Sequence, residues 1–318
     1  MSESPRLNEP PVSRHAPLKP LWHPVAWPAW IAIGIGWCLS RLPLPWIFAL
    51  GRLLGTAFYY LVASRRRIVR INLRLCFPSL DPEATEALLR ENFRHTASGV
   101  LEALLPWLNP ARDLSPHIDV IGAEHYHNAR AQGRGVLVLA AHFTVMDVIS
   151  APLGRLGGFD VMYRYNKNPA WQWLQITGRQ RYFEGVVERE EIRLALKRLR
   201  AGRAIWYAID QDYGRKHSVF APFFGVPAAT IVATSRFARL NHSPVLFMTT
   251  SRDLVRQRWS ITFHPVISDF PGTNDQEDAS RLNAHIESFI REQPAQYLWM
   301  HRRFKTRPDD ERGFYSKS

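Results

Sequence analysis

The hydrophobic pattern divides the chain into an apolar N-terminal part and a longer part of alternating character. Residues 25–39 carry no charged side chain, and residues 42–63 carry one, Arg52. The stretch before them, Met1 to about Lys19, is rich in proline and contains almost no large apolar side chain. Because such a composition cannot form a core, we predict that this stretch is a disordered tail.

Beyond Asp81, short continuous apolar runs alternate with amphipathic stretches, which predicts strands and helices in turn. The expected strands cover residues 135–141, 159–163, 204–209, 244–250 and 260–266. The expected helices cover residues 82–108, 144–156, 169–180, 190–200, 228–240 and 279–291. Alternation at this spacing predicts an α/β fold with a central, mostly parallel sheet flanked by helices.

The apolar N-terminal part is predicted to form a membrane-anchoring helical segment. A helix of residues 25–39 covers about 22 Å, which is shorter than the hydrocarbon core of about 30 Å. One short anchor helix and two segments lying partly in the interface therefore both remain open, as does a buried helical hairpin. Indole side chains favour the headgroup zone, and five tryptophans lie in or beside this part: Trp22, Trp27, Trp30, Trp37 and Trp46.

These patterns predict three parts. Residues 1–21 are expected to form a basic disordered tail, residues 22–64 membrane-anchor or interfacial helices, and residues 65–318 the main folded domain. The two cysteines, Cys38 and Cys76, exclude a disulfide scaffold and a cysteine-rich zinc module.

The chain contains 41 Lys and Arg against 28 Asp and Glu, a net charge of +13. This excess predicts a polyanionic partner, which could be nucleic acid, an anionic membrane surface or a phosphorylated substrate. No nucleic-acid reading motif is recognisable, and much of the basic charge flanks the apolar segments. Arginines are concentrated after residue 40, so the positive-inside rule predicts that the body of the chain lies in the cytoplasm.

The strongest candidate chemistry follows the predicted strand 135–141. His142 comes directly after it, and Asp147 lies five residues further on, an H-x-x-x-x-D arrangement. An imidazole oriented by a carboxylate is the usual general base for activating a hydroxyl, so we expect Asp147 to orient His142. The sequence has no Gly-x-Ser-x-Gly elbow, Walker A loop or G-x-G-x-x-G turn. A base without a protein nucleophile indicates direct transfer to a bound substrate hydroxyl.

Six blocks in one order resemble the late acyltransferases of lipid A biosynthesis, the lauroyl-, myristoyl- and palmitoleoyl-transferase type. The resemblance extends from about residue 25 to residue 315, whereas H-x-x-x-x-D alone indicates only the wider glycerolipid acyltransferase group. The blocks are Asn72–Pro78 (NLRLCFP), Ala141–Asp147 (AHFTVMD), Tyr163–Arg164, Trp206–Gly214 (WYAIDQDYG), Phe220–Ala228 (FAPFFGVPA) and Tyr297–Pro308 (YLWMHRRFKTRP).

The resemblance implies transfer of a fatty acyl chain, lauroyl or similar, from acyl carrier protein. The implied acceptor is a hydroxyl of an acyl chain on a phosphorylated, Kdo-bearing lipid A precursor. It also implies an inner-membrane protein with a cytoplasmic active site, and it implies neither a metal nor a cofactor. One alternative is transfer to another membrane glycerolipid or glycolipid, and a remote one is a membrane-anchored nucleic-acid-binding protein.

The resemblance also suggests residues around the catalytic pair. Arg164 is expected to meet substrate phosphate or the acyl carbonyl, Asp210 and Asp212 to support the site loop or cap its turn, and Phe223 and Phe224 to form an acyl-chain wall or ordinary core. The expected substrate-binding residues are Arg164, Arg189, Asp210, Asp212, Arg302 and Arg303. The basic run beginning at His301 is expected to engage sugar phosphates or anionic headgroups.

Overall fold

The computed structural model describes residues 19–309 and 311–316, so most of the predicted tail lies outside the described residues. The helices are α1 (Trp27–Leu39), α2 (Leu44–Leu61), α3 (Ala63–Cys76), α4 (Pro82–Leu108), α5 (Ala123–Ala131), α6 (Ser150–Leu156), α7 (Pro169–Gln180), α8 (Ile192–Arg200), α9 (Ala233–Asn241) and α10 (Asp275–Glu292). The strands are β1 (Ile118–Ile121), β2 (Val136–Ala140), β3 (Phe159–Tyr163), β4 (Gly185–Glu188), β5 (Ala204–Ala208), β6 (Ser218–Phe223), β7 (Val226–Ile231), β8 (Val245–Asp253) and β9 (Arg258–Val266).

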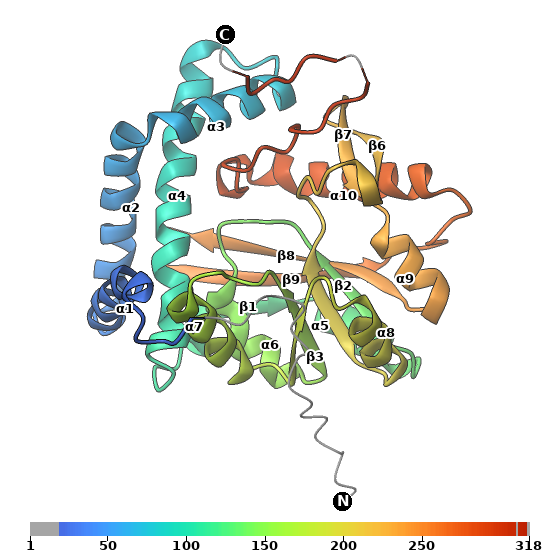
Figure 1. Ribbon diagram of the computed structural model, residues 1–318, viewed down its shortest axis with the longest axis horizontal. Helices are drawn as coiled ribbons and strands as arrows, with labels where there is room; N and C mark the ends of the chain where they lie inside the picture. Colours follow the sequence, from blue (N-terminus) through green and yellow to red (C-terminus); the bar gives the residue numbers. More distant parts are fainter. Residues whose placement is uncertain (1–18, 310, 317–318) are drawn as a thin grey trace, which may run out of the picture.

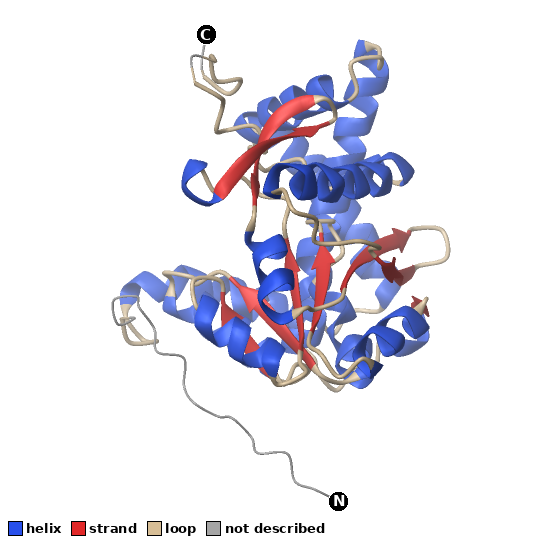
Figure 2. Cartoon of the chain, turned by 90° about the vertical axis from the view of Figure 1, so that its right-hand side faces the viewer, coloured by secondary structure: helices blue, strands red, loops and turns tan. Residues whose placement is uncertain are grey.

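Seven strands form the central sheet in the order β1-β9-β8-β2-β5-β3-β4. Every neighbouring pair is parallel except β8 and β9. Helices cover both faces of this sheet, whereas β6 and β7 form a separate antiparallel ribbon (Figures 1 and 2). The predicted α/β fold with a mostly parallel central sheet is confirmed.

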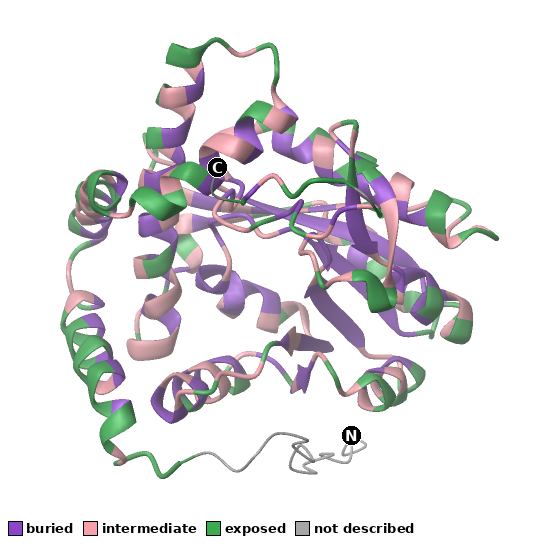
Figure 3. Ribbon diagram, turned by 45° about the horizontal axis from the view of Figure 1, so that its top comes forward, coloured by how far each residue is buried: buried purple, intermediate pink, exposed green. Residues whose placement is uncertain are grey.

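Alternate residues of the buried strands face the two cores. Leu137 and Leu139 of β2 lie in a core with residues of α3, α8, α9 and α10. Val136 and Val138, on the opposite face of the same strand, pack with residues of α2, α5 and α6. Figure 3 shows the strands of the sheet as buried throughout most of their length. Because successive side chains of a strand point to opposite faces, β2 contributes to the core on each side of the sheet.

The structure differs from the predicted elements most clearly after β2 and after β5. The helix predicted for residues 144–156 begins only at Ser150, after a 3₁₀ turn at Asp147–Ile149. Residues 228–231 belong to strand β7 and not to the beginning of a helix, and α9 begins at Ala233. Phe224 and Gly225 have φ angles of 50° and 77°, left-handed conformations that close the hairpin between β6 and β7. Two short strands at the sheet edges, the largely exposed β1 and the mostly buried β4, were not predicted.

The N-terminal helices α1 and α2 pack on α4. In Figure 1, α2 runs alongside α4, and α1 lies at one end of this pair. Gly55 permits the close approach, because a Cβ atom there would lie 2.4 Å from Arg94 Cα and 2.6 Å from the Phe93 carbonyl oxygen. Within the described residues, α2 is the one helix long and apolar enough to cross a membrane. A third of that helix is nevertheless buried against the rest of the chain.

Candidate active site

The register of two central strands brings His142 and Asp210 together. Ala140 of β2 pairs with Ala208 of β5, so the residues two positions beyond each strand end lie side by side. The Nδ1 atom of His142 is 2.6 Å from Asp210 Oδ1. The backbone N–H of His142 donates to Asp210 Oδ2 at 3.0 Å. One carboxylate therefore fixes both the ring and the backbone of the candidate base.

The orienting carboxylate is Asp210, which corrects the expectation that Asp147 would hold His142. Asp147 begins a short 3₁₀ turn, is buried, and accepts two hydrogen bonds from Arg179 of α7, at 2.9 and 3.2 Å. Arg179 is itself 9% exposed. The Asp147–Arg179 pair thus connects the loop after β2 to α7. The Asp147 carboxylate is bound to the Arg179 guanidinium and does not contact His142.

The C-terminal segment completes the site by pairing with the loop after β2. Leu298 N–H donates to the His142 carbonyl oxygen at 2.8 Å, and Thr144 N–H donates to the Gln296 carbonyl oxygen at 2.7 Å. This pairing brings the His301 ring to 5.3 Å from the His142 ring, centroid to centroid. The Gln211 side-chain nitrogen lies 3.0 Å from His142 Nε2 and 2.9 Å from His301 Nε2.

The electrostatics of these groups follow from burial and from each other. Burial would raise the pKa of Asp210, but the His142 ring, its two hydrogen bonds and the Tyr297 hydroxyl hold that pKa well below its usual range. Burial and the neighbouring His142 lower the pKa of His301 to about 4. At neutral pH, Asp210 is therefore ionised and His301 is neutral.

A buried network beneath the site holds the loop after β2. Arg252 of β8 donates to both carboxylate oxygens of Glu102 and, at 3.3 Å, to the Thr144 hydroxyl. The same guanidinium contacts His95 Nδ1 at 2.8 Å. At Gly99 of α4, a Cβ atom would lie 1.9 Å from the Thr144 carbonyl oxygen. Only glycine lets α4 approach the loop this closely.

Three of the residues predicted to bind substrate surround the central pair. Arg164 is exposed, and its charge acts on His301, so it lies on the same side as the site. Arg189 lies over the Tyr213 ring at 5.2 Å. Asp212 accepts hydrogen bonds from Gly214 N–H at 2.9 Å and from Thr306. Asp212 therefore joins the loop after β5 to the C-terminal segment.

Arg302 and Arg303 of the basic run that begins at His301 differ in their surroundings. Arg303 is 1% exposed; its guanidinium donates to the Ala229 carbonyl oxygen at 2.6 Å and to the Thr230 hydroxyl at 2.9 Å. The expected substrate-binding role of Arg303 is thus corrected to a structural one, because the extended C-terminal segment directs this side chain inward. Arg302 is exposed and lies 5.9 Å from the Tyr315 ring.

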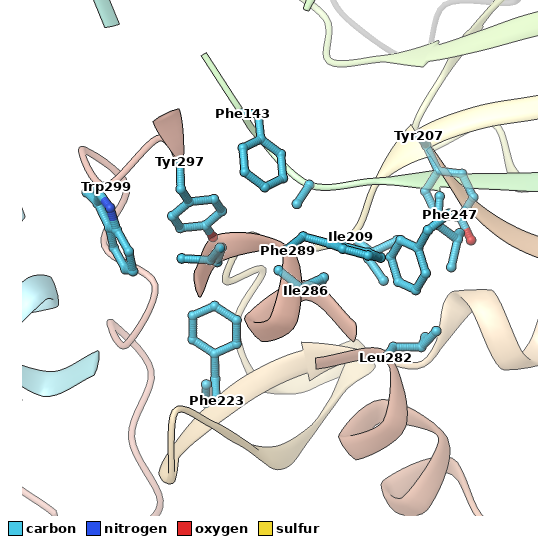
Figure 4. Packing of buried hydrophobic residues seen from close by; sticks show 14 of the residues in the cluster. Phe143, Tyr207, Ile209, Phe223, Phe247, Leu282, Ile286, Phe289, Tyr297 and Trp299 are labelled. Carbon is cyan, nitrogen blue, oxygen red and sulfur yellow. The ribbon is translucent and has the colours of Figure 1, made fainter. Parts of the chain in front are cut away.

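The acyl-wall prediction is also corrected for Phe223. This residue ends β6, is fully buried and packs in the core against Tyr297, as Figure 4 shows. Phe224 is half-buried at the hairpin turn, with its ring 5.1 Å from that of Phe77. The expected apolar loop is therefore a hairpin tip packed on Phe77, which follows α3, and on Trp299 of the C-terminal segment.

Gln211 and Arg179 are the site residues that the sequence patterns did not identify. Gln211 lies between the two aspartates of the block after β5, where its position beside a strand end was the available signal. Within the described ranges, no three His, Cys, Asp or Glu side chains come close enough together to hold a metal ion. The arrangement offers an oriented imidazole whose Nε2 faces a hydrogen-bond donor, which suits base catalysis on a hydroxyl.

Comparison with known proteins finds matches over most of the chain. Residues 17–306 match the family model for the bacterial lipid A biosynthesis acyltransferases. The Escherichia coli lipid A biosynthesis lauroyltransferase is 34% identical over 290 residues, 91% of this chain and 95% of the relative. The palmitoleoyltransferase of the same organism is 35% identical over 294 residues, 92% and 96% of the two chains. Its myristoyltransferase is 28% identical over 295 residues, 91% and 90%.

Proposed function

Since the chain belongs to the bacterial lipid A biosynthesis acyltransferase family, and is therefore an acyltransferase, we propose its donor, acceptor and base. The donor is acyl carrier protein loaded with a lauroyl or similar chain. The acceptor is a hydroxyl of an acyl chain on a Kdo-bearing lipid A precursor. The observation that carries the mechanism is the His142–Asp210 pair at the carboxyl ends of β2 and β5.

In this mechanism, His142 Nε2 removes the proton of the acceptor hydroxyl as its oxygen attacks the thioester carbonyl carbon. A C–O bond forms, and the carbonyl oxygen takes up negative charge. When the C–S bond breaks, the imidazolium returns the proton to the leaving thiolate. Asp210 keeps a proton on Nδ1 and stabilises the imidazolium, the role of the carboxylate in triad chemistry. Asp147 acts through Arg179 by fixing the loop that carries His142.

The acceptor's phosphate groups are proposed to meet the arginines on the open side of the site. Arg164 is exposed there, and Arg65 lies close enough to act on the same imidazole, that of His301. Arg189 stands nearby over Tyr213. Guanidinium groups bind phosphate oxygens in pairs, so this rim suits a phosphorylated lipid better than an uncharged one.

The acidic carrier protein is proposed to dock on the outer face of α3. A cavity of about 440 Å³ lies there between α3 and the C-terminal segment. Four arginines line it, Arg67, Arg70, Arg74 and Arg312. Arg70 is paired with Glu86 at 2.7 Å and Arg67 donates to the Tyr315 carbonyl oxygen, while Arg74 and Arg312 are exposed. Such a surface attracts an acidic partner and weakens with salt.

The N-terminal helices are proposed to attach residues 22–64 to the inner membrane, with residues 65–318 as a catalytic domain in the cytoplasm. Much of the outer face of these helices is exposed (Figure 3). Exposed apolar side chains lie on both helices: Trp27, Ile31, Ile35, Trp46, Leu53 and Leu61. Because α2 packs lengthwise on α4, which also carries charged side chains such as Glu91 and Arg94, the pair suits helices lying in the interface better than a helix crossing the bilayer.

A direct test uses purified protein, acylated carrier protein and phosphorylated lipid A precursor, with the product measured by mass spectrometry. The wild type should add one acyl chain, and a folded His142→Ala variant should add none. Glu277→Gln, an exposed change on α10 outside the basic run, is the control. Full activity in folded His142→Ala would exclude the mechanism, and preferential transfer to a glycerophospholipid would replace the acceptor.

A further inference from the structure

The Gln211 carboxamide bridges two imidazoles that come from distant parts of the chain. Its nitrogen lies 3.0 Å from His142 Nε2 and 2.9 Å from His301 Nε2. Gln211 follows β5, His142 follows β2, and His301 lies in the C-terminal segment. All three side chains are partly exposed, so a substrate can reach them. The nitrogen of one amide therefore stands at the centre of the site.

The directions of these two hydrogen bonds follow from the amide nitrogen that faces both rings. A carboxamide nitrogen carries two N–H donors and accepts nothing, so each imidazole must present the lone pair of its Nε2 atom. In His142, the proton then resides on Nδ1 and faces Asp210 Oδ1, 2.6 Å away. His301 can accept only while neutral, and burial together with nearby His142, Arg65 and Arg164 favours its neutral form over the opposing effect of Asp210.

The amide occupies the position that the substrate hydroxyl needs. For His142 Nε2 to remove a proton, the hydroxyl must replace the Gln211 N–H as its hydrogen-bond donor. One N–H of Gln211 is then released beside the reacting carbon, while the other N–H stays on His301. No proton leaves Gln211 at any step. A neutral donor held next to the reacting carbon is the requirement for stabilising the charge that develops on the carbonyl oxygen.

Building on the function proposed above, we propose that Gln211 donates a hydrogen bond to the oxyanion formed from the thioester carbonyl, and that His301 is a positioning residue that holds the carboxamide in place. Gln211 is then a catalytic residue because it touches the reacting atoms. His301 acts only through Gln211. The geometry that carries this assignment is the two nearly equal distances from one nitrogen to the two Nε2 atoms.

The test measures kcat and KM of acyl transfer for Gln211→Ala, His301→Ala and His301→Gln, with folding checked by circular dichroism. Losing one oxyanion donor lowers kcat by about 10² to 10³-fold, so Gln211→Ala should show that loss with little change in KM. His301→Ala should lower kcat less, and His301→Gln should restore it, because the glutamine oxygen replaces Nε2 as acceptor. Glu277→Gln, an exposed change on α10 outside the basic run, is the control.

A double variant separates positioning from structural support. If His301 acts only through Gln211, Gln211→Ala/His301→Ala should be no slower than Gln211→Ala alone, a non-additivity expected of coupled residues. A folded Gln211→Ala variant with kcat within about threefold of the wild type would overturn the assignment of the oxyanion donor. Additive losses in the double variant, or no rescue by His301→Gln, would overturn the positioning role.

Hydrolysis of the acylated carrier protein without a lipid acceptor provides a second readout, since water attack forms the same oxyanion. Gln211→Ala should slow this hydrolysis as it slows transfer. If the wild type hydrolyses the thioester but does not acylate the lipid A precursor, the acceptor in the proposed function is wrong while the role of Gln211 is still measured. Equal hydrolysis by wild type and Gln211→Ala would reject the oxyanion assignment alone.

Discussion

Replacing Asp210 by asparagine tests which carboxylate orients the candidate base. In the wild type, Oδ1 faces the His142 ring nitrogen at 2.6 Å and Oδ2 accepts from the His142 backbone N–H at 3.0 Å. Asparagine keeps the shape of the side chain but has one acceptor oxygen instead of two. One of the two N–H groups of His142 therefore loses its partner, and the negative charge is removed.

The size of the effect follows from the charge that forms on His142 during the reaction. When the imidazole takes a proton, its charge centre lies about 4 Å from that of the carboxylate. At an effective dielectric constant of about 20, the attraction is worth about 4 kcal/mol. Each 1.36 kcal/mol changes a rate tenfold, so Asp210→Asn should lower kcat by about 10³-fold. Because Asp210 is 2% exposed, water cannot replace its charge.

The assay compares Asp210→Asn with Asp147→Asn, for both kcat of acyl transfer and melting temperature. Asp147 is paired with Arg179, so its neutralisation leaves a buried cation without a partner. Breaking such a pair costs about 3–5 kcal/mol of folding free energy. We therefore expect Asp147→Asn to lower the melting temperature strongly and kcat by less than about tenfold in the folded fraction.

The reverse pattern would refute this reasoning. If folded Asp147→Asn were as inactive as His142→Ala while Asp210→Asn kept more than about a tenth of wild-type kcat, the orientation of His142 by Asp210 would be wrong. The carboxylate of Asp147 would then have to leave Arg179 and reach His142 in the working enzyme. Arg179→Ala would distinguish that case, because it would release Asp147 and raise the rate.

Three further predictions concern stability, donor docking and the N-terminal helices. Burial lowers the pKa of His95 from 6.5 to about 3, so the unfolded chain binds the proton more readily. The free energy of unfolding should therefore fall as the pH drops from about 6.5 to 3, by up to about 1.4 kcal/mol per pH unit. In urea unfolding, folded His95→Gln should show a weaker dependence of stability on pH, and an unchanged dependence would contradict this prediction. Arg74→Glu/Arg312→Glu should raise KM about tenfold for acyl carrier protein but not for a neutral acyl-pantetheine donor; an equal rise for both donors would exclude docking there. Gly55→Leu should lower the stability measured in thermal melts by about 1–3 kcal/mol. Gly34→Leu should not, because a Cβ atom at Gly34 would have no neighbour within 4 Å. Equal losses in the two variants would contradict the close contact between α2 and α4.

The helices and strands were predictable where the local sequence pattern alone determines the element. The strand 159–163 and the helices 82–108 and 169–180 have the predicted bounds. Each helix begins at a proline that follows a capping residue, Asp81 or Asn168, and the strand follows two glycines. The edge strands β1 and β4 have four residues each and acquire their strand character only by pairing with β9 and β3. No local pattern encodes that pairing.

The sequence identified the main residues of the site but not which of them contact one another. Both His142 and Asp210 were identified as residues just past predicted strands. Which carboxylate faces the imidazole depends on β2 and β5 being neighbours in register, and strand order is a property of the whole sheet. Closeness in sequence favoured Asp147, but a loop that turns away after β2 sends that side chain to α7.

The basic run at the C-terminus shows why net charge must be counted from the folded chain. His301 faces the site, Arg303 is enclosed by backbone carbonyl oxygens, and Arg302 and Lys305 are exposed. Arg252 is neutralised by Glu102 in a buried pair, which removes one charge of each sign and leaves the net charge unchanged. Because Arg303 is buried among neutral groups, fewer of the 41 Lys and Arg side chains can meet a polyanionic partner than the composition implies. Exposed arginines lie on several surfaces, of which α3 and the rim at Arg164 are the two proposed to bind partners. If a phosphorylated lipid and an acidic carrier divide these two surfaces, salt should weaken both, whereas Arg74→Glu should weaken only the carrier.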